Sequence, residues 1–455
     1  MIANPSQSRA HIHGRPLKPL AVVLLTGFLG ACSSLNPFGG EEVQRVEGER
    51  IAVLGNQSLS VEPDAAIADV AVRLPPPYLN MEWPQPGGFP AHALYHLQTG
   101  PELKVAWTAR AGAGDSSDTR LIAQPIVTGD SIYVLDTTAH VNALDLEGQH
   151  RWSVNLQPED EDSPTGFFGG VAYDGGRVYV TTGYGDVVAL NAGDGSEVWR
   201  RPIGIPFRSA PTVNGGRVFG ITQDNQLFAL STDDGEVLWN HVGISESAGF
   251  LGAASPAVSG EAVVVPFSSG ELFALRVENG RVIWSDNLIR TGATTPIAAL
   301  NDIRGQVVVD RGDVFASSHS GSTVGIELRT GTRLWDRSIG SSNTPWAGGD
   351  FIYMISDDNE VICLTRAGGR VRWVTRLPRF EDEEDATGAI VWSGPVLAGD
   401  RLLLASNTGV MTAISPYTGD ALGTIQLPGR TTISPVVANG TVYVLMTDGR
   451  IAAIR

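Results

Sequence analysis

The chain has 455 residues, 42% of them hydrophobic, which is enough to bury a large core. Its 49 acidic and 32 basic residues give a formal net charge of −17, which argues against sequence-independent nucleic-acid binding, because such binding needs a basic surface. The same charge opposes adsorption to an anionic membrane, so contact with a membrane would need an anchor.

The first 31 residues have the pattern of a secretory signal peptide. Three basic residues, Arg9, Arg15 and Lys18, precede an apolar run at residues 20–29, and small residues follow it. The run is too short to span a bilayer, since a membrane helix needs about 20 apolar residues. We therefore predict a signal peptide over residues 1–31.

The end of this signal peptide, Leu29-Gly30-Ala31-Cys32, resembles the lipobox of bacterial lipoproteins. In lipoproteins the cysteine becomes the new N-terminus and is acylated through its sulfur. Acyl chains anchor stably because each buried methylene contributes about 0.8 kcal/mol. The resemblance implies that Cys32 is lipidated; the alternative is a cysteine that follows the signal by chance. Ser33 rather than aspartate comes next, which by lipoprotein sorting implies delivery to the outer membrane.

Residues 32–100 contain no copy of the repeat described below and are expected to form a tether and an irregular arm. Residues 33–40 are typical of a flexible tether, and residues 49–54 favour a short strand. The prolines at residues 75–77 and 83–88 exclude a regular helix or a central strand, because proline has no N–H donor. We expect the arm to run over the surface of the folded body.

A glycine followed four residues later by a tryptophan recurs along the rest of the chain. The copies are Gly148 and Trp152, Gly195 and Trp199, Gly235 and Trp239, Gly280 and Trp284, Gly331 and Trp335, and Gly369 and Trp373. A seventh tryptophan, Trp107, precedes them at a similar spacing. Self-similarity at a period of forty-odd residues indicates a propeller or another stacked array.

One repeat, residues 209–239, predicts four short strands. Apolar segments at residues 210–213 and 226–230 alternate with segments at 217–221 and 236–239. The turn at residues 214–216, Asn-Gly-Gly, suits the positive φ of a tight hairpin. Four antiparallel strands joined by hairpins form one propeller blade.

The repeats predict an all-β, eight-bladed propeller over residues 101–455. Seven units can be placed from residue 124 to about residue 424, the seventh with Gly423 in the tryptophan position. An eighth, from residue 434, has three strands, and residues 103–107 supply the fourth. A last blade built from both ends of the propeller would close the ring and remove its open edge. Seven blades are the alternative.

Several side chains have a structural explanation. We expect each repeat tryptophan to lie between adjacent blades with its indole N–H on a carbonyl, rather than to form a cofactor site. Cys363 lies in an apolar run and is expected to be a buried, inert thiol. The acidic runs at residues 159–162 and 381–385 are expected to be solvated loops, with a weak cation site or a basic partner as the alternative.

The segment from Asp194 to Trp199 and its copies resemble the repeat of pyrroloquinoline-quinone-type β-propellers. Two kinds of protein share that repeat: the quinoprotein dehydrogenases and the BamB family of outer-membrane β-barrel assembly lipoproteins. The resemblance covers about residues 102–455. The signal, the lipobox, the length of a single propeller and the blade closed by an N-terminal strand are similar to the BamB family.

That resemblance implies a non-catalytic scaffold without a cofactor, anchored by lipid at the periplasmic face of the cell outer membrane. Its implied partner is a BamA-like barrel protein, bound through its POTRA domains. Nascent outer-membrane proteins are a second implied partner, bound at strand edges. The membrane is contacted through the lipid anchor only, and no nucleic acid is implied.

In the BamB family, partner contacts come from two loops that precede neighbouring blades. The matching positions here are Ala248, Phe250 and Leu251 before one blade, and Asp302 and Arg304 before the next. Phe250 keeps an apolar side chain and Asp302 keeps the acid. Ala248, Leu251 and Arg304 depart from the family pattern. The alternative is that Phe250 and Leu251 only pack beneath a loop.

A quinoprotein dehydrogenase is the second hypothesis for function, and a generic ligand-binding propeller is the third. The dehydrogenases carry an adjacent, disulfide-linked cysteine pair over the quinone and a bound Ca²⁺. Here the two cysteines, Cys32 and Cys363, are far apart in sequence. The sequence also shows no catalytic triad order, no metal-spaced His/Cys cluster and no dinucleotide fingerprint. No catalytic, cofactor-binding or metal-binding residue is therefore predicted.

Overall fold

The computed structural model describes residues 61–159, 161, 169–246, 249–290 and 300–455. The predicted signal peptide, Cys32, the tether, the short strand at residues 49–54 and Ala248 lie outside the described residues. Residues 60–455 form one compact unit. Its described part contains one 3₁₀ turn, η1 (Ala65–Ile67), and no helix that is long and apolar enough to cross a membrane.

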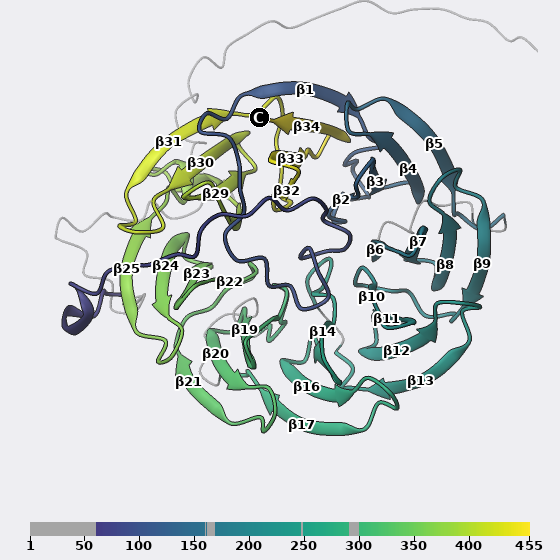
Figure 1. Cartoon of the computed structure of the whole chain (residues 1–455), viewed down its shortest axis with the longest axis horizontal. Coiled ribbons are helices and arrows are strands. Elements are labelled where there is room, and N and C mark those ends of the chain that lie inside the picture. Colours follow the sequence, from purple (N-terminus) through teal and green to yellow (C-terminus); the bar gives the residue numbers. More distant parts are fainter. Residues whose placement is uncertain (1–60, 160, 162–168, 247–248, 291–299) are drawn as a thin grey trace, which may run out of the picture. The chain divides into compact units, whose positions relative to one another are not determined.

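Eight four-stranded antiparallel sheets follow one another around a ring within the described residues (Figure 1). The predicted eight-bladed propeller is confirmed, and the seven-bladed alternative is wrong. Blades 1 to 4 comprise β2 (Ile126–Val127), β3 (Ser131–Leu135), β4 (His140–Asp145) and β5 (His150–Asn155); β6 (Gly169–Asp174), β7 (Arg177–Thr182), β8 (Asp186–Asn191) and β9 (Glu197–Pro202); β10 (Thr212–Asn214), β11 (Arg217–Ile221), β12 (Gln226–Ser231) and β13 (Val237–Val242); and β14 (Ala257–Ser259), β15 (Ala262–Pro266), β16 (Glu271–Arg276) and β17 (Val282–Asn287). Blades 5 to 8 comprise β18 (Val308–Asp310), β19 (Asp313–Ser318), β20 (Ser322–Glu327) and β21 (Arg333–Arg337); β22 (Trp346–Gly348), β23 (Phe351–Ile355), β24 (Glu360–Thr365) and β25 (Val371–Arg376); β28 (Trp392–Ala398), β29 (Arg401–Ser406), β30 (Val410–Ile414) and β31 (Ala421–Gln426); and β32 (Val436–Ala438), β33 (Thr441–Leu445), β34 (Arg450–Ile454) and β1 (Val105–Arg110).

The last blade is closed by strands from opposite ends of the propeller, as predicted. Strand β1 pairs antiparallel with β34, with Trp107 opposite Ala453, and the two strands lie side by side in Figure 1. The Lys104 N–H donates to the Arg455 carbonyl at 2.8 Å, and the Arg455 N–H donates back at 2.9 Å. The fourth strand of blade 8 is thus held by hydrogen bonds and packing alone, without a turn to its neighbour.

The glycine and the tryptophan of the repeat interlock between neighbouring blades. Trp284 of blade 4 lies opposite the small residue Ala274 and is 7% exposed. Its indole N–H donates to the Leu328 carbonyl of blade 5 at 2.6 Å. Gly331 of blade 5 has a φ of +75° and packs on the same ring, where a Cβ would come within 2.6 Å of Trp284 Cγ. The glycine is therefore required both by its backbone conformation and by the ring of the preceding blade.

The other repeat tryptophans follow the same geometry, which confirms their predicted place between blades. Their indole N–H groups donate to carbonyls of the next blade as follows: Trp152 to Ala192, Trp199 to Thr232, Trp239 to Val277, Trp335 to Arg366 and Trp373 to Pro416. Trp107 is an exception, because its buried indole N–H has no partner among the described residues. The turn that faces it, between Leu144 and Gly148, is one residue shorter than in the other repeats.

The missing tryptophan of blade 7 also has a structural reason. Gly423 lies opposite Ala413, in the register that tryptophan occupies in other blades. A tryptophan there would pack on the turn between the third and fourth strands of blade 8. Those strands are β34 and β1, which are not consecutive, so no such turn exists. The gap in the repeat therefore coincides with the joint of the ring.

The arm behaves differently in its two described parts. Residues 64–70 lie on the outer strand of blade 6, as expected for a surface arm: Asp64 pairs with Arg370 at 2.7 Å. Residues 80–97 instead cross the centre of the ring (Figure 1), so the expected surface path is wrong for this segment. Trp83 is 2% exposed and Leu97 is fully buried.

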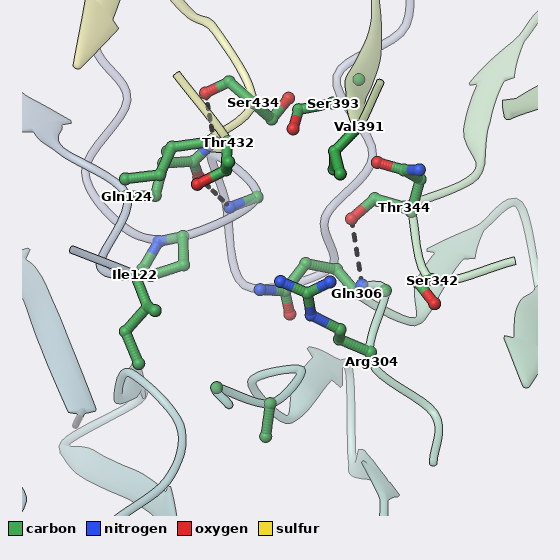
Figure 2. Close-up of a pocket in the computed structure, with 18 of the residues that line it drawn as sticks. Ile122, Gln124, Arg304, Gln306, Ser342, Thr344, Val391, Ser393, Thr432 and Ser434 are labelled. Carbon is green, nitrogen blue, oxygen red and sulfur yellow. Dashed lines mark hydrogen bonds between the residues drawn. The ribbon is translucent and has the colours of Figure 1, made fainter. Parts of the chain in front are cut away.

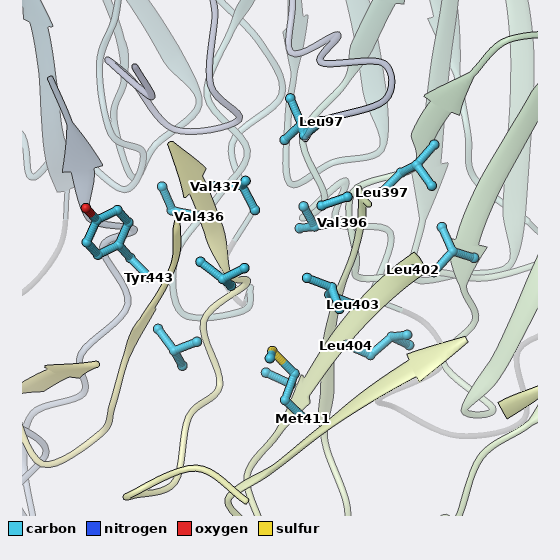
Figure 3. Packing of buried hydrophobic residues seen from close by; sticks show 14 of the residues in the cluster. Leu97, Val396, Leu397, Leu402, Leu403, Leu404, Met411, Val436, Val437 and Tyr443 are labelled. Carbon is cyan, nitrogen blue, oxygen red and sulfur yellow. The ribbon is translucent and has the colours of Figure 1, made fainter. Parts of the chain in front are cut away.

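Residues 80–97 hydrogen-bond to the first strand of every blade. The bonded pairs are Trp83 and Val127, Pro84 and Tyr173, Gln85 and Val213, Pro90 and Val258, Ala91 and Val309, Tyr95 and Trp346, Leu97 and Leu397, and Asn80 and Val437, for blades 1 to 8 in order. First strands present unpaired N–H and C=O groups to the axis, and the arm satisfies some of them. Leu97 also packs with Val396 and Leu397 in the largest core cluster (Figure 3).

Two further expectations can be compared with the structure. Cys363 is fully buried and free, which confirms the predicted burial, and burial raises the pKa of its thiol. The acidic run at residues 381–385 is exposed as expected. It also forms part of a small hairpin, β26 (Phe380–Asp382) and β27 (Thr387–Ala389), which was not predicted. Of the other run, Glu159 and Glu161 are described, and both are exposed.

The interlock predicts different costs for two similar glycine substitutions in blade 5. Gly331 and Gly312 both have positive φ, but a Cβ at Gly312 would meet nothing within 4 Å. Both Gly→Ala variants carry the strain of a left-handed alanine. Gly331→Ala also forces the Trp284 ring to move, so we expect it to lower the free energy of unfolding by about 1–3 kcal/mol more than Gly312→Ala. Urea unfolding monitored by tryptophan fluorescence measures this difference, and equal losses would contradict the interlock.

Candidate functional site

The segments that lead into the first strands of blades 3 to 6 lie around the axis of the ring. We call residues 203–211, 249–256, 300–307 and 338–345 the entry loops. Together with arm residues Trp83, Gly87 and His92, they line one side of a cavity of about 400 Å³, and residues 121–124, 390–395 and 432–434 of blades 1, 7 and 8 line the other. Hydroxyl, amide and guanidinium groups are prominent in its lining (Figure 2). Within the described ranges, no three His, Cys, Asp or Glu side chains gather as metal ligands.

The structure brings the four described candidate residues together at this cavity. Phe250 and Leu251 lie on the entry loop of blade 4, and Asp302 and Arg304 lie on that of blade 5. Leu251 and Arg304 line the cavity, and Leu251 is 44% exposed. Phe250 is half-buried, with its ring edge-on to His319 at a centroid distance of 4.7 Å. Asp302 is 1% exposed, so the direct partner contact implied by the resemblance would require the loops to open.

Asp302 forms a clamp with a residue that the sequence did not single out, Arg208. The Arg208 guanidinium donates to Asp302 Oδ2 at 2.7 Å and to the Gly252 carbonyl at 3.2 Å. Asp302 Oδ2 also accepts the Phe250 N–H at 3.2 Å. Arg208 belongs to blade 3 and Asp302 to blade 5, so the pair holds the entry loop of blade 4 between them. Removing one partner of such a buried pair typically costs about 3–5 kcal/mol.

A second set of hydrogen bonds ties successive entry loops together. Ser255 Oγ donates to the Ala210 carbonyl at 2.9 Å, and the Ser255 N–H donates to Gln306 Oε1 at 2.7 Å. The Gln306 N–H donates in turn to Thr344 Oγ1 at 3.0 Å (Figure 2). Blades 3, 4, 5 and 6 are therefore linked in order around the cavity, which gives its rim a fixed shape.

His319 connects Phe250 to a second carboxylate. Its Nδ1 lies 2.8 Å from Asp357 Oδ2, and this hydrogen bond raises the pKa of His319, while burial opposes the increase. The charge of Asp302 raises the same pKa further, and that of Arg304 lowers it. Burial lowers the pKa of Arg304, and the charges of Asp302 and Asp357 oppose that decrease.

Arg208 and His319 are the residues that sequence reasoning missed. Arg208 lies 94 positions before Asp302, and His319 lies 38 positions before Asp357. Neither residue belongs to the repeated phrase, and no local pattern marks either as part of a pair. The one available hint is the resemblance itself, which pointed to their neighbours Phe250 and Asp302.

Comparisons with known proteins agree on one family. A family model described as "Outer membrane protein assembly factor BamB" matches residues 137–375 and 377–455. An outer membrane protein assembly factor BamB from Salmonella typhimurium is 30% identical, over 72% of this chain and 83% of its own length. The solved BamB of Moraxella catarrhalis is 20% identical with a TM-score of 0.64, covering 78% of this chain and all of that one.

The fold extends to redox enzymes as well. The structure of a quinohemoprotein alcohol dehydrogenase from Comamonas testosteroni has a TM-score of 0.63 at 15% identity, covering 82% of this chain and 80% of that chain. At that identity the likeness bears on the fold alone.

The His319–Asp357 pair predicts a pH-dependent contribution to stability. Because the folded pKa of His319 is raised, its contribution is full below the unfolded value of about 6.5 and is lost as pH rises through the folded pKa. His319→Gln should therefore lower the free energy of unfolding more at about pH 5.5 than at about pH 8.5.

Asp357→Asn provides the control, because it removes the partner and leaves the imidazole. We expect the same loss of pH dependence from it and no further loss in the double variant, as measured by urea unfolding at both pH values. An effect of His319→Gln that is identical at the two pH values would refute the raised pKa.

Proposed function

Since the chain belongs to the family of outer membrane protein assembly factor BamB, we propose that it is a non-catalytic scaffold of the machinery that assembles β-barrel proteins in the outer membrane. The match of the family model over most of the propeller carries this proposal. Its relatives at 30% identity, which cover most of the chain, bear the name of assembly factors, not of enzymes. The chain thereby assists the folding and insertion of outer-membrane proteins.

The partner is the barrel subunit of that machinery, a BamA-like protein, bound through its periplasmic POTRA domains. Leu251 and Phe250 make the contact, because Leu251 is the more exposed apolar residue of a loop that the Arg208–Asp302 clamp holds in place. Arg304 contributes from the edge of the cavity. Asp302 acts through the clamp, since its carboxylate is buried and paired.

Membership of the family associates the chain with the outer membrane. We further propose that Cys32 carries the lipid and that the propeller faces the periplasm. The lipobox at residues 29–32 supports the anchor. The net charge of −17 supports an anchor of this kind, because the protein surface itself has little attraction for an anionic bilayer.

The partner surface is tested by comparing two exposed leucines. Leu251→Asp should weaken binding to the purified barrel subunit at least about tenfold, because a charge replaces an apolar contact at the centre of the interface. Leu334→Asp is the matched control: Leu334 is 45% exposed, against 44% for Leu251, and lies on the outer strand β21. Surface plasmon resonance with the POTRA region as ligand measures both, and equal affinities for the two variants would rule out this surface.

The anchor is tested by the two cysteines. Cys32→Ala should leave the chain without acyl groups, so it should separate from the membrane fraction when cells are broken. Cys363→Ala is the control, because this buried thiol has no role in anchoring. Mass spectrometry of the mature N-terminal peptide gives a second measurement. An unmodified Cys32 in the wild-type chain would overturn the lipid assignment.

A further inference from the structure

Arg304 is a cation without a counter-ion in the axial cavity. In the described part of the chain its guanidinium makes no hydrogen bond or ion pair. The two carboxylates whose charges act on Arg304 already have partners. Asp302 pairs with Arg208, and Asp357 pairs with His319. The chain as a whole has a net charge of −17, so this partly desolvated, unpaired guanidinium forms a local positive site. Such a site favours the binding of an anion.

A neighbouring amide adds a second free donor. Gln306 Oε1 accepts the Ser255 N–H at 2.7 Å, which fixes the orientation of the amide and leaves its Nε2 hydrogens without a partner among the described residues. Gln306 and Arg304 both extend into the space between the entry loops (Figure 2). A guanidinium and an amide that face the same cavity can donate to the two oxygens of a planar carboxylate.

The arm residue His92 lines the same cavity, but its free acceptor atom is closed off from it. His92 Nδ1 lies 2.8 Å from the Val307 carbonyl and must therefore carry the ring proton. Its Nε2 is buried and has no partner among the described residues. Burial lowers the pKa of His92 to about 4, so the ring is neutral at neutral pH and Nε2 is an acceptor. His92 therefore shapes the wall of the cavity, and the free donors that face a ligand are those of Arg304 and Gln306.

We propose that the axial cavity binds a carboxylate, with Arg304 and Gln306 holding its two oxygens. A doubly charged phosphate fits less well, because Asp302 and Asp357 lie close to Arg304 and would repel its second charge. Both a free acylated amino acid and the C-terminal residue of a polypeptide have this chemistry. A cavity of about 400 Å³ has room for either.

The experiment measures binding to the full chain purified in detergent, by isothermal titration calorimetry. The probes are N-acetyl-alanine, N-acetyl-alaninamide, and a ten-residue peptide made with either a free or an amidated C-terminus. We expect a free acid to bind, and its amide to bind at least about tenfold more weakly, because a charge-assisted pair is lost. If N-acetyl-alanine binds, a small free acid is sufficient as the ligand. If only the peptide with a free C-terminus binds, the ligand is the end of a polypeptide.

Two variants with the same change in charge complete the test. Arg304→Gln should weaken binding of the free acid at least about tenfold, and Arg304→Lys should weaken it less, since the charge remains without the two-pronged geometry. Arg276→Gln is the control, because Arg276 is 54% exposed and pairs with Glu261 away from the cavity. The proposal is overturned if neither acid binds, if acid and amide bind equally, or if Arg304→Gln changes affinity no more than Arg276→Gln does. The probes contain no barrel subunit, so this result is independent of the proposed function.

Discussion

The packing of each tryptophan on the glycine turn of the next blade is the interaction on which the ring depends. A single blade cannot bury its own tryptophan, because the carbonyl and the glycine that receive it belong to the following blade. Every such contact therefore needs its neighbour, and the sequence of contacts is complete only when the chain returns on itself. The two irregular places, Trp107 and Gly423, flank blade 8, where strands from both ends of the propeller meet. If the interlock is what maintains the repeat, departures from the repeat are expected at this joint, where the regular interlock cannot form.

The interlock and the rim of the axial cavity lie on different loops. The glycine turns join third to fourth strands, whereas the entry loops join one blade to the next, so the entry loops can change without loss of the interlock. Residues 80–97 hydrogen-bond to the first strand of each blade and supply part of the cavity lining. The hydrogen bonds through Ser255 and Gln306 then fix the entry loops to one another. A rim held in this way loses little conformational entropy on binding a partner.

The features that could be predicted from the sequence belong to the repeat, and the features that were missed lie outside it. The blade count, the closing strand and the surroundings of the tryptophans follow from a repeated pattern of local contacts. The path of residues 80–97 has no such signature: successive hydrogen bonds reach different blades, and most of them are made by the backbone, whatever the side chain. The Arg208–Asp302 clamp joins residues 94 positions apart by one contact, which leaves no trace in either local sequence. The resemblance singled out Asp302 as a partner contact, but its burial depends on Arg208 and could not be read from either local sequence.

The arrangement of charge at the rim sets Arg304 apart from Arg208 and Asp302, the other charged residues of the entry loops. Asp302 is neutralised by Arg208, and His319 is paired with Asp357, so neither carboxylate is free to select a partner. Arg304 is directed into the axial cavity, where the family pattern has an acid at the equivalent position (Figure 2). The departure from the family pattern at Arg304 therefore places a positive charge at the axial cavity. In the proposed partner contact, Leu251 and the edge of Phe250 contribute through shape and apolar area, which are largely independent of salt.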